Sequence, residues 1–287
     1  MNAKMRAEIR THFEQIATAV FWPSDISNFA REHRREWGDA NLSAPQVLKF
    51  LLKEGLIVSA EFTSRKYHHI VRYLHGKPSP YELGVSLRRN SFLSHRTALM
   101  VHGFEPPTTT KIYVNQEQRP KPAPEGITQE SINLAFKNQQ RQSNYIFKYG
   151  SSQFVLISGK DTGRAGVVHT KGPNGETITA TDLERTIIDI VVRPAYAGGL
   201  KQVVAVYKEV APRLDVDHMI KLFQKLDYAY PYHQSIGFLL ERAGRTVREC
   251  KKFKDFGLKF DFYLDYDLKH PAYDRSWRLF YPALLDR

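Results

Sequence analysis

Cysteine is nearly absent from this sequence, since Cys250 is the one cysteine among 287 residues. A single thiol excludes an internal disulfide framework and is typical of a protein from a reducing compartment. Cations flank Cys250 and could lower its pKa, but we favour a buried, unreactive thiol. Long apolar runs are also missing, and no signal segment with a charged start and an apolar stretch opens the chain. We therefore expect a cytoplasmic protein with no membrane partner.

Acidic residues are scarce relative to basic ones. The chain has 30 Asp and Glu against 42 Lys and Arg, a formal net charge of +12. Such an excess favours polyanionic partners, nucleic acid above all, but says nothing about fold. The alternative is a generally basic surface with no dedicated partner. A hydrophobic content of 42% is ordinary for a globular protein, and the length allows two or three domains.

Two helices separated by a polar turn are predicted near the N-terminus. They span residues 25–33 and 43–55, and the turn between them covers residues 38–42. Ser24 or Asp25 would cap the first helix, because both side chains accept hydrogen bonds from free backbone N–H groups. A helix, a turn and a second helix in this order are the start of a helix-turn-helix motif.

The second helix has the pattern of a DNA-recognition helix. Ser43 suits its N-terminal cap, Pro45 its first turn and Gly55 its C-terminal stop. Apolar residues at helical spacing are expected to face the core: Val47, Leu48, Leu51 and Leu52. The cap and the outward polar residues would then contact DNA: Ser43, Gln46, Lys49 and Lys53.

Two short β-prone segments follow, at residues 56–62 and 68–74, and residues 63–67 form a basic turn between them. A hairpin directly after a recognition helix is a wing, and Arg65 and Lys66 at its tip would meet phosphates or enter the minor groove. The alternative is an unrelated hairpin with an ordinary solvated turn. Helix, turn, helix and hairpin in order, with the charges outside, predict a winged helix-turn-helix.

A glycine and two prolines within residues 76–80 (GKPSP) mark the clearest domain boundary. We predict a winged helix-turn-helix domain over residues 1–77 and a mixed α/β lobe over residues 78–180. A mainly helical lobe over residues 181–287 would carry one terminal strand at residues 260–268, where apolar and polar residues alternate. The predicted fold class is therefore α+β.

Few residues point to catalysis. An acid-x-Lys element lies within residues 265–269 (DYDLK) and involves Asp265, Asp267 and Lys269. Elements of this kind position a metal and a water in restriction-type nucleases, and Asp261 is a possible second carboxylate. A solvated strand face explains these residues equally well. No histidine pair has a convincing metal-ligand spacing, and no nucleophile, base and orienting acid can be assembled. We expect a protein that is not an enzyme and has no metal or cofactor.

A second basic cluster lies between the last predicted helix and the terminal strand: Arg242, Arg245, Arg248, Lys251, Lys252, Lys254 and Lys259. The three-residue spacing of its arginines would align them along one helical face. Such a face could bind nucleic acid, dock an acidic partner or only keep the protein soluble, the last being the commonest case.

Three sequence blocks stand in a fixed order behind the predicted winged helix. They are residues 91–104 (SFLSHRTALMVHGF), residues 179–189 (TATDLERTIID) with residues 193–199 (RPAYAGG), and residues 234–241 (QSIGFLLE). Each block is weak alone, but the combination is fairly specific. In these blocks and their order the chain resembles the AbiEi family of abortive-infection antitoxins, up to about Gly244.

The resemblance implies a bacterial two-gene system. In such a system the antitoxin represses its own promoter and counteracts a nucleotidyltransferase toxin. The winged helix would bind inverted repeats in the promoter DNA, and the C-terminal region would neutralise the toxin. Three alternatives remain: a metal-dependent DNA nuclease that uses the acid-x-Lys element, an enzyme that covalently modifies the toxin, and a stand-alone DNA-binding regulator.

Glu184, Arg185 and Asp189 match the central motif of the family. Thr181 and Glu184 have the spacing of a capping box, threonine at the cap and glutamate three residues later, so we expect a structural role for Glu184. For Arg185 and Asp189 two roles stay open: a buried ion pair or a functional role.

Overall fold

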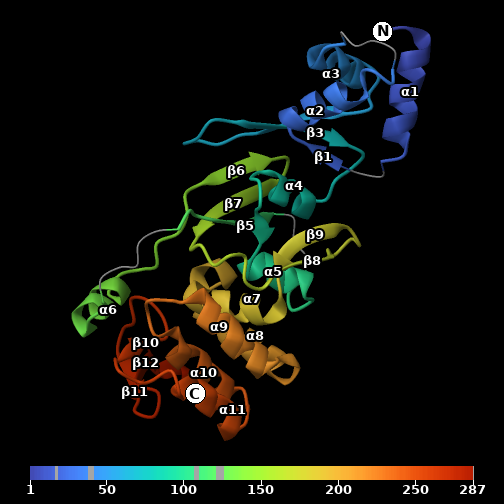
Figure 1. The fold of residues 1–287 in the computed structure, drawn as a ribbon. Helices are drawn as coiled ribbons and strands as arrows, with labels where there is room; N and C mark the ends of the chain where they lie inside the picture. The colour runs from blue at the N-terminus through green and yellow to red at the C-terminus, as the bar shows by residue number, and fades with distance from the viewer. Residues whose placement is uncertain (17–18, 38–41, 107–109, 121–125, 287) are drawn as a thin grey trace.

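The computed structural model describes residues 1–16, 19–37, 42–106, 110–120 and 126–286. It contains helices and three separate sheets, which confirms the α+β class. An N-terminal unit lies at one end of the molecule, a six-stranded sheet in the middle and a group of helices at the other end (Figure 1). Most of the predicted turn at residues 38–42 lies outside the described residues.

The N-terminal unit consists of three helices and a three-stranded antiparallel sheet in the order β1–β3–β2. Its elements are α1 (Ala3–Glu14), β1 (Ala19–Phe21), α2 (Pro23–His33), α3 (Ala44–Lys53), β2 (Val58–Phe62) and β3 (Ile70–His75). The two predicted helices and the hairpin are therefore confirmed. The core between them is apolar and includes Ile9, Phe13, Val47 and Leu51.

Two details of these helices differ from the predictions. Asp25 lies in the first turn of α2, where its Oδ2 accepts a hydrogen bond of 2.8 Å from the backbone N–H of Trp22. The cap position belongs to Trp22, because the helix begins at Pro23. On α3, Leu52 is 39% exposed and Phe50 is buried in its place, because the apolar stripe turns toward the side that contacts α1 and α2.

The hairpin β2–β3 belongs to two cores. Phe62 and Leu74 are buried in the same cluster as Phe154 of the central sheet, and the backbones of Thr63 and Lys148 exchange hydrogen bonds of 2.9 and 2.8 Å. The start of the hairpin tip is thus paired with the edge strand β6 (Ile146–Tyr149), and Figure 1 shows the hairpin beside this strand. The boundary at residue 77 stays a prediction.

The central sheet has the strand order β6–β7–β5–β4–β9–β8. Its strands are β4 (Phe92–Leu93), β5 (Lys111–Glu117), β6 (Ile146–Tyr149), β7 (Ser152–Gly159), β8 (Val167–Lys171) and β9 (Thr177–Thr181). β5 pairs with β7 and β4 with β9 in parallel, and the other pairs are antiparallel. The helices of this region are α4 (Pro80–Ser86), α5 (His95–Val101) and α6 (Gln129–Phe136).

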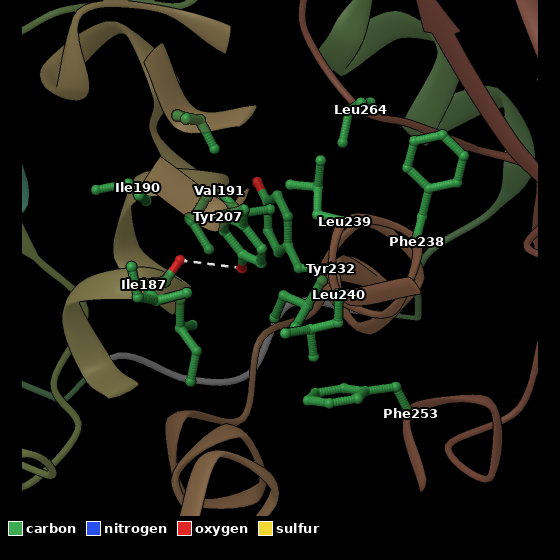
Figure 2. Packing of buried hydrophobic residues seen from close by; sticks show 14 of the residues in the cluster. Ile187, Ile190, Val191, Tyr207, Tyr232, Phe238, Leu239, Leu240, Phe253 and Leu264 are labelled. Carbon is green, nitrogen blue, oxygen red and sulfur yellow. Dashed lines mark hydrogen bonds between the residues drawn. The ribbon is translucent and has the colours of Figure 1, made fainter. Parts of the chain in front are cut away.

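The C-terminal region is built on helices, as predicted. They are α7 (Leu183–Val192), α8 (Leu200–Val210), α9 (Val216–Leu226), α10 (Tyr232–Arg242) and α11 (Val247–Lys254). Their apolar side chains form the largest core, part of which Figure 2 shows between α7, α8 and α10. The buried hydroxyl of Tyr207 donates to the carbonyl of Ile187 at 3.3 Å, so this polar group is satisfied inside the core.

The predicted single strand at residues 260–268 is wrong. Only β10 (Phe262–Tyr263) forms there, and it joins β11 (Pro271–Asp274) and β12 (Leu279–Pro282) in a small sheet of order β10–β12–β11. Four residues beyond the end of β10, Asp267 has a φ of 51°, and its N–H bonds to the carbonyl of Phe136 on α6.

Candidate functional site

The outward face of α3 carries the predicted polar residues. Gln46, Lys49 and Lys53 are all exposed. Ser43 is the N-cap, and its backbone N–H and its hydroxyl donate to Oε1 of Gln46 at 2.9 and 2.8 Å. This capping box uses the carbonyl oxygen of Gln46 locally. Its amide nitrogen has no hydrogen-bond partner in the described part of the chain and is left to donate outward.

The tip of the hairpin adds a second group of exposed cations. Arg65 and Lys66 are exposed there, as predicted for a basic turn. Together with Lys148 of β6 they line a groove of about 550 Å³. Sequence reasoning missed Lys148, because only the pairing of Thr63 with Lys148 brings this residue to the hairpin. The groove is therefore lined by cations from two distant parts of the sequence.

The second basic cluster does not form one helical face. Arg242 ends α10, Gly244 turns the chain with a φ of 84°, and Arg248 lies on the separate helix α11. Several cations of the cluster are neutralised in ion pairs: Arg242 with Asp286, Arg245 with Glu249 and Lys252 with Asp217. Arg248 and Lys251 are exposed and, among the residues described, have no ion-pair partner. The shared face was predicted because the turn at Gly244 was not recognised.

The acid-x-Lys element is not assembled into a metal site. Asp261 accepts hydrogen bonds from Nε of Arg278 at 2.9 Å and from the hydroxyl of Tyr273 at 2.6 Å, and the Arg278 contact lowers the pKa of Asp261. Lys269 pairs with Asp267 at 2.7 Å. Burial raises the pKa of Asp265, whose Oδ1 accepts from the N–H of Tyr266. These contacts explain the residues as local structure.

Asp182, Glu184 and His218 form a different cluster, with potential ligand atoms within 4.8 Å of one another. Asp182 caps α7, since its Oδ1 accepts from the N–H of Arg185 at 2.7 Å and its Oδ2 lies 3.0 Å from Nε2 of His218. Glu184 accepts from the N–H of Asp215 at 3.0 Å. These contacts join α7 to α9, so the cluster is explained as structure.

Thr181 was predicted to cap α7, and this prediction is wrong. Thr181 ends strand β9, and its hydroxyl lies 2.7 Å from that of Thr186, while Asp182 occupies the N-cap. Aspartate caps a helix at least as well as threonine does, and the helix begins one residue later than the spacing predicted. Glu184 has a structural contact, as expected, but with α9 instead of its own helix end.

Arg185 and Asp189 form a buried ion pair. Nε of Arg185 lies 2.8 Å from Oδ1 of Asp189, and the two side chains are 4% and 5% exposed. Burial alone would lower the pKa of Arg185, but the attraction of the Asp189 carboxylate is stronger and raises the pKa of Arg185. Nη1 of Arg185 also donates to the carbonyl of Ala165 at 2.7 Å. The buried ion pair is therefore present, and it leaves a functional role of the two residues open.

The same pair lines a cavity of about 490 Å³ beside the central sheet. His95, from the first sequence block, and Tyr196, from the second, lie in its wall with Arg185 and Asp189. Burial lowers the pKa of His95 to about 4, so the imidazole is neutral at pH 7, and Ser94 Oγ lies 2.8 Å from its Nδ1. His95 has a φ of 51°, a left-handed backbone conformation that is uncommon outside glycine. The first two blocks thus meet at one place.

Cys250 is buried, as favoured from the sequence. Burial raises the pKa of its thiol to about 11, and Glu241 and Glu249 add to this, so the neighbouring cations do not prevail. A thiol with a raised pKa is a poor nucleophile at pH 7.

None of the helices in the described ranges has the combined length and apolar character that a bilayer crossing requires. Comparison with known families gives no match, and no curated protein matches the sequence. Among solved structures, the chain is similar to the crystal structure of the RV2827C protein from Mycobacterium tuberculosis. The identity is 13%, the TM-score is 0.54, and the match covers 98% of this chain and 92% of that chain. The similarity extends over the whole fold and, at this identity, concerns the fold alone.

Proposed function

We propose that the protein is a DNA-binding antitoxin that represses its own promoter and counteracts a nucleotidyltransferase toxin. The cationic surface formed by α3 and the hairpin tip carries the DNA-binding part of this proposal. The element order α1–β1–α2–α3–β2–β3 and the strand order β1–β3–β2 support a winged helix-turn-helix. The antitoxin part rests on the three sequence blocks.

The dimensions of α3 suit the major groove. Its ten residues span about 15 Å along the helix axis. An α-helix with its side chains is about 10–12 Å in diameter and fits the major groove of DNA, which is roughly 12 Å wide. In this arrangement the free amide nitrogen of Gln46 would donate to a base edge, whereas Lys49 and Lys53 would meet phosphates. The contacts with phosphate position the protein, and Gln46 contributes sequence preference.

The hairpin is held in place before DNA arrives. Its tip pairs with β6 through Thr63 and Lys148, and the hydroxyl of Tyr67 donates to Asn144 at 2.9 Å. A pre-positioned wing loses less conformational freedom on binding than a mobile one. Arg65 and Lys66 would therefore add affinity with little ordering cost.

Gel-shift titration with the DNA upstream of the gene tests the DNA-binding part. Lys49→Ala, Arg65→Ala and Lys66→Ala should each weaken binding to every duplex, while Gln46→Ala should reduce the preference for the promoter over unrelated DNA. Unchanged promoter binding when all four residues are replaced would contradict the site.

Co-expression with the product of the adjacent gene tests the antitoxin part. Full-length protein should rescue growth, and so should the variant in which the four DNA-contacting residues are replaced, because neutralisation is assigned to the C-terminal region. Point variants are preferable to removing residues 1–77, since Phe62 and Leu74 fill part of the central core. No toxicity from the neighbour, or no rescue, would leave a stand-alone DNA-binding regulator.

A further inference from the structure

The cavity at the Arg185–Asp189 pair has polar groups that the protein leaves unpaired. Oδ1 of Asp189 accepts from Arg185 and, at 3.4 Å, from the hydroxyl of Tyr228. Oδ2 of Asp189 is buried and has no hydrogen-bond partner within the described ranges of the chain. Nη2 of Arg185 likewise has no hydrogen bond among the described residues. An unsatisfied buried carboxylate oxygen is costly, so it points to a donor supplied from outside the chain.

The charges around the cavity are strongly unequal. Among the residues that the structure describes, four cations and one carboxylate line it: Arg141, Lys160, Arg185, Arg193 and Asp189. His95 is neutral at pH 7, because burial lowers its pKa to about 4. A cavity with this balance favours an anion.

The cations and the carboxylate lie at different depths. Arg141 and Arg193 are exposed, whereas Asp189 is buried. Arg141 has no ion pair or hydrogen bond from its side chain in the part of the chain that is described. Lys160 is already bound to Asp227 and to the carbonyl of Leu226. The free positive charge is therefore at the mouth of the cavity, and the free acceptor is inside.

The wall is rich in aromatic rings. In the described part of the chain, five tyrosines line the cavity: Tyr196, Tyr228, Tyr230, Tyr232 and Tyr266. Burial, with the neighbouring Asp189, raises the pKa of Tyr228, so its hydroxyl stays protonated and donates. The hydroxyl of Tyr196 accepts from the N–H of Ser143 at 2.7 Å and keeps its own proton for another acceptor. Such a wall offers stacking surface and hydrogen-bond donors to a flat ring.

We propose that this cavity binds a nucleoside phosphate, with the base against the tyrosines and Asp189 and the phosphates at Arg141 and Arg193. Oδ2 of Asp189 has almost no accessible surface, so a small rotation of its side chain is needed before it can accept from an N–H group of the base. The phosphates stay near the mouth, because the carboxylate inside repels them. A volume of about 490 Å³ lies in the range of small-molecule sites. Inorganic phosphate alone satisfies only the outer half of this arrangement.

Isothermal titration calorimetry of the full-length protein tests the proposal, with each of the four common ribonucleoside triphosphates as the probe. At least one should bind, and the matching nucleoside and inorganic triphosphate should each bind at least tenfold more weakly. Arg141→Ala should weaken nucleotide binding about tenfold, which corresponds to about 1.4 kcal/mol. Arg275→Ala removes the same charge from an exposed arginine that does not line the cavity and should change nothing.

Asp189→Asn tests the inner half of the site, since it replaces one acceptor oxygen by a donor of equal size. It should abolish the difference between nucleotide and inorganic triphosphate. Because this change also breaks the pair with Arg185, Tyr228→Phe serves as a second inner variant that keeps the pair, and it should weaken nucleotide binding. Absence of binding by all four nucleotides, equal affinity for inorganic triphosphate, or equal losses in Arg141→Ala and Arg275→Ala would overturn the proposal.

Discussion

Arg72 is a cation that the fold has buried, with 3% of its surface exposed. Its guanidinium donates to the carbonyls of Ser86 and Leu87 at 2.8 and 3.0 Å and lies 3.6 Å from the centre of the Trp22 ring. Burial, with Arg88 nearby, lowers its pKa to about 10, so it is still charged at pH 7. One side chain thus ties the hairpin, the end of α4 and the start of α2 together.

Arg72→Met should destabilise the protein by about 3 kcal/mol, because two buried carbonyls lose their donor. Chemical denaturation with urea measures the loss. Arg89→Met is the matched control, since Arg89 also lies over Trp22 but its side chain is 61% exposed. The control should lose less than about 1 kcal/mol. Equal losses in the two variants would contradict the role given to Arg72.

His95 predicts a pH dependence of stability. Its pKa falls from 6.5 in the unfolded chain to about 4 in the folded protein, chiefly because of burial. Between these two pH values the unfolded chain binds a proton that the folded protein does not, so stability falls as the pH is lowered. The contribution reaches about 3 kcal/mol below pH 4.

His95→Asn should remove this part of the decline between pH 6.5 and 4, and asparagine tolerates the positive φ at this position. Urea titrations at several pH values measure it. His169→Asn, at an exposed histidine, should keep the decline of the natural protein. If His95→Asn and His169→Asn declined in parallel, the buried neutral state of His95 would be wrong.

At the scale of single elements, α10 is held against the small C-terminal sheet at very close range. A Cβ added to Gly237 would lie 2.1 Å from the buried ring of Trp277. Gln234, one turn earlier, donates to the carbonyls of Trp277 and Arg278, and Glu241 accepts from the indole N–H. The third sequence block is thus explained by the packing of α10 on Trp277.

Gly237→Ala should therefore destabilise the protein by about 2 to 3 kcal/mol, because neither the helix nor the buried indole has room to move. Thermal unfolding followed by circular dichroism measures the change. Gly126→Ala is the control, since an added Cβ meets nothing within 4 Å there, and it should stay within about 0.5 kcal/mol. A neutral Gly237→Ala would show that α10 and Trp277 do not lie this close.

Local signals were sufficient to predict several elements. Ser43, Pro45 and Gly55 marked the ends of α3, and alternation with a basic turn marked the hairpin, because caps, stops and turns depend on neighbouring residues. The central ion pair was also foreseen as a possibility, since Arg185 and Asp189 are four residues apart on one helix.

Contacts between distant residues were not predictable in this way. The pairing of Thr63 with Lys148, the neutralisation of Arg242 by Asp286, and the cavity itself depend on the three-dimensional arrangement. The alternation at residues 260–268 gave a false strand for the same reason. A partner strand long enough to pair with it is not present in the small sheet, where β12 (Leu279–Pro282) is four residues long.

At the scale of the whole molecule, the net charge of +12 favours nonspecific attraction to polyanions in general. The DNA-binding proposal requires that the cations of α3 and the hairpin tip contribute more than other exposed cations do. The pairing of the hairpin with β6 fixes this surface relative to the central sheet. Each protein cation that neutralises a phosphate releases counterions from the DNA. A defined site therefore differs from diffuse attraction because only the cations of that site change the salt dependence of binding.

The salt dependence of DNA binding tests this claim most directly. Fluorescence anisotropy of a labelled promoter duplex would be measured at several salt concentrations. The triple variant Lys49→Ala, Arg65→Ala, Lys66→Ala should lower the slope of log K against log salt by about three, or about one for each lost phosphate contact. The matched triple variant Lys137→Ala, Arg248→Ala, Lys251→Ala removes the same charge from other exposed positions and should leave the slope unchanged. Equal slopes in the two variants would contradict the assignment of the DNA-binding surface to α3 and the hairpin.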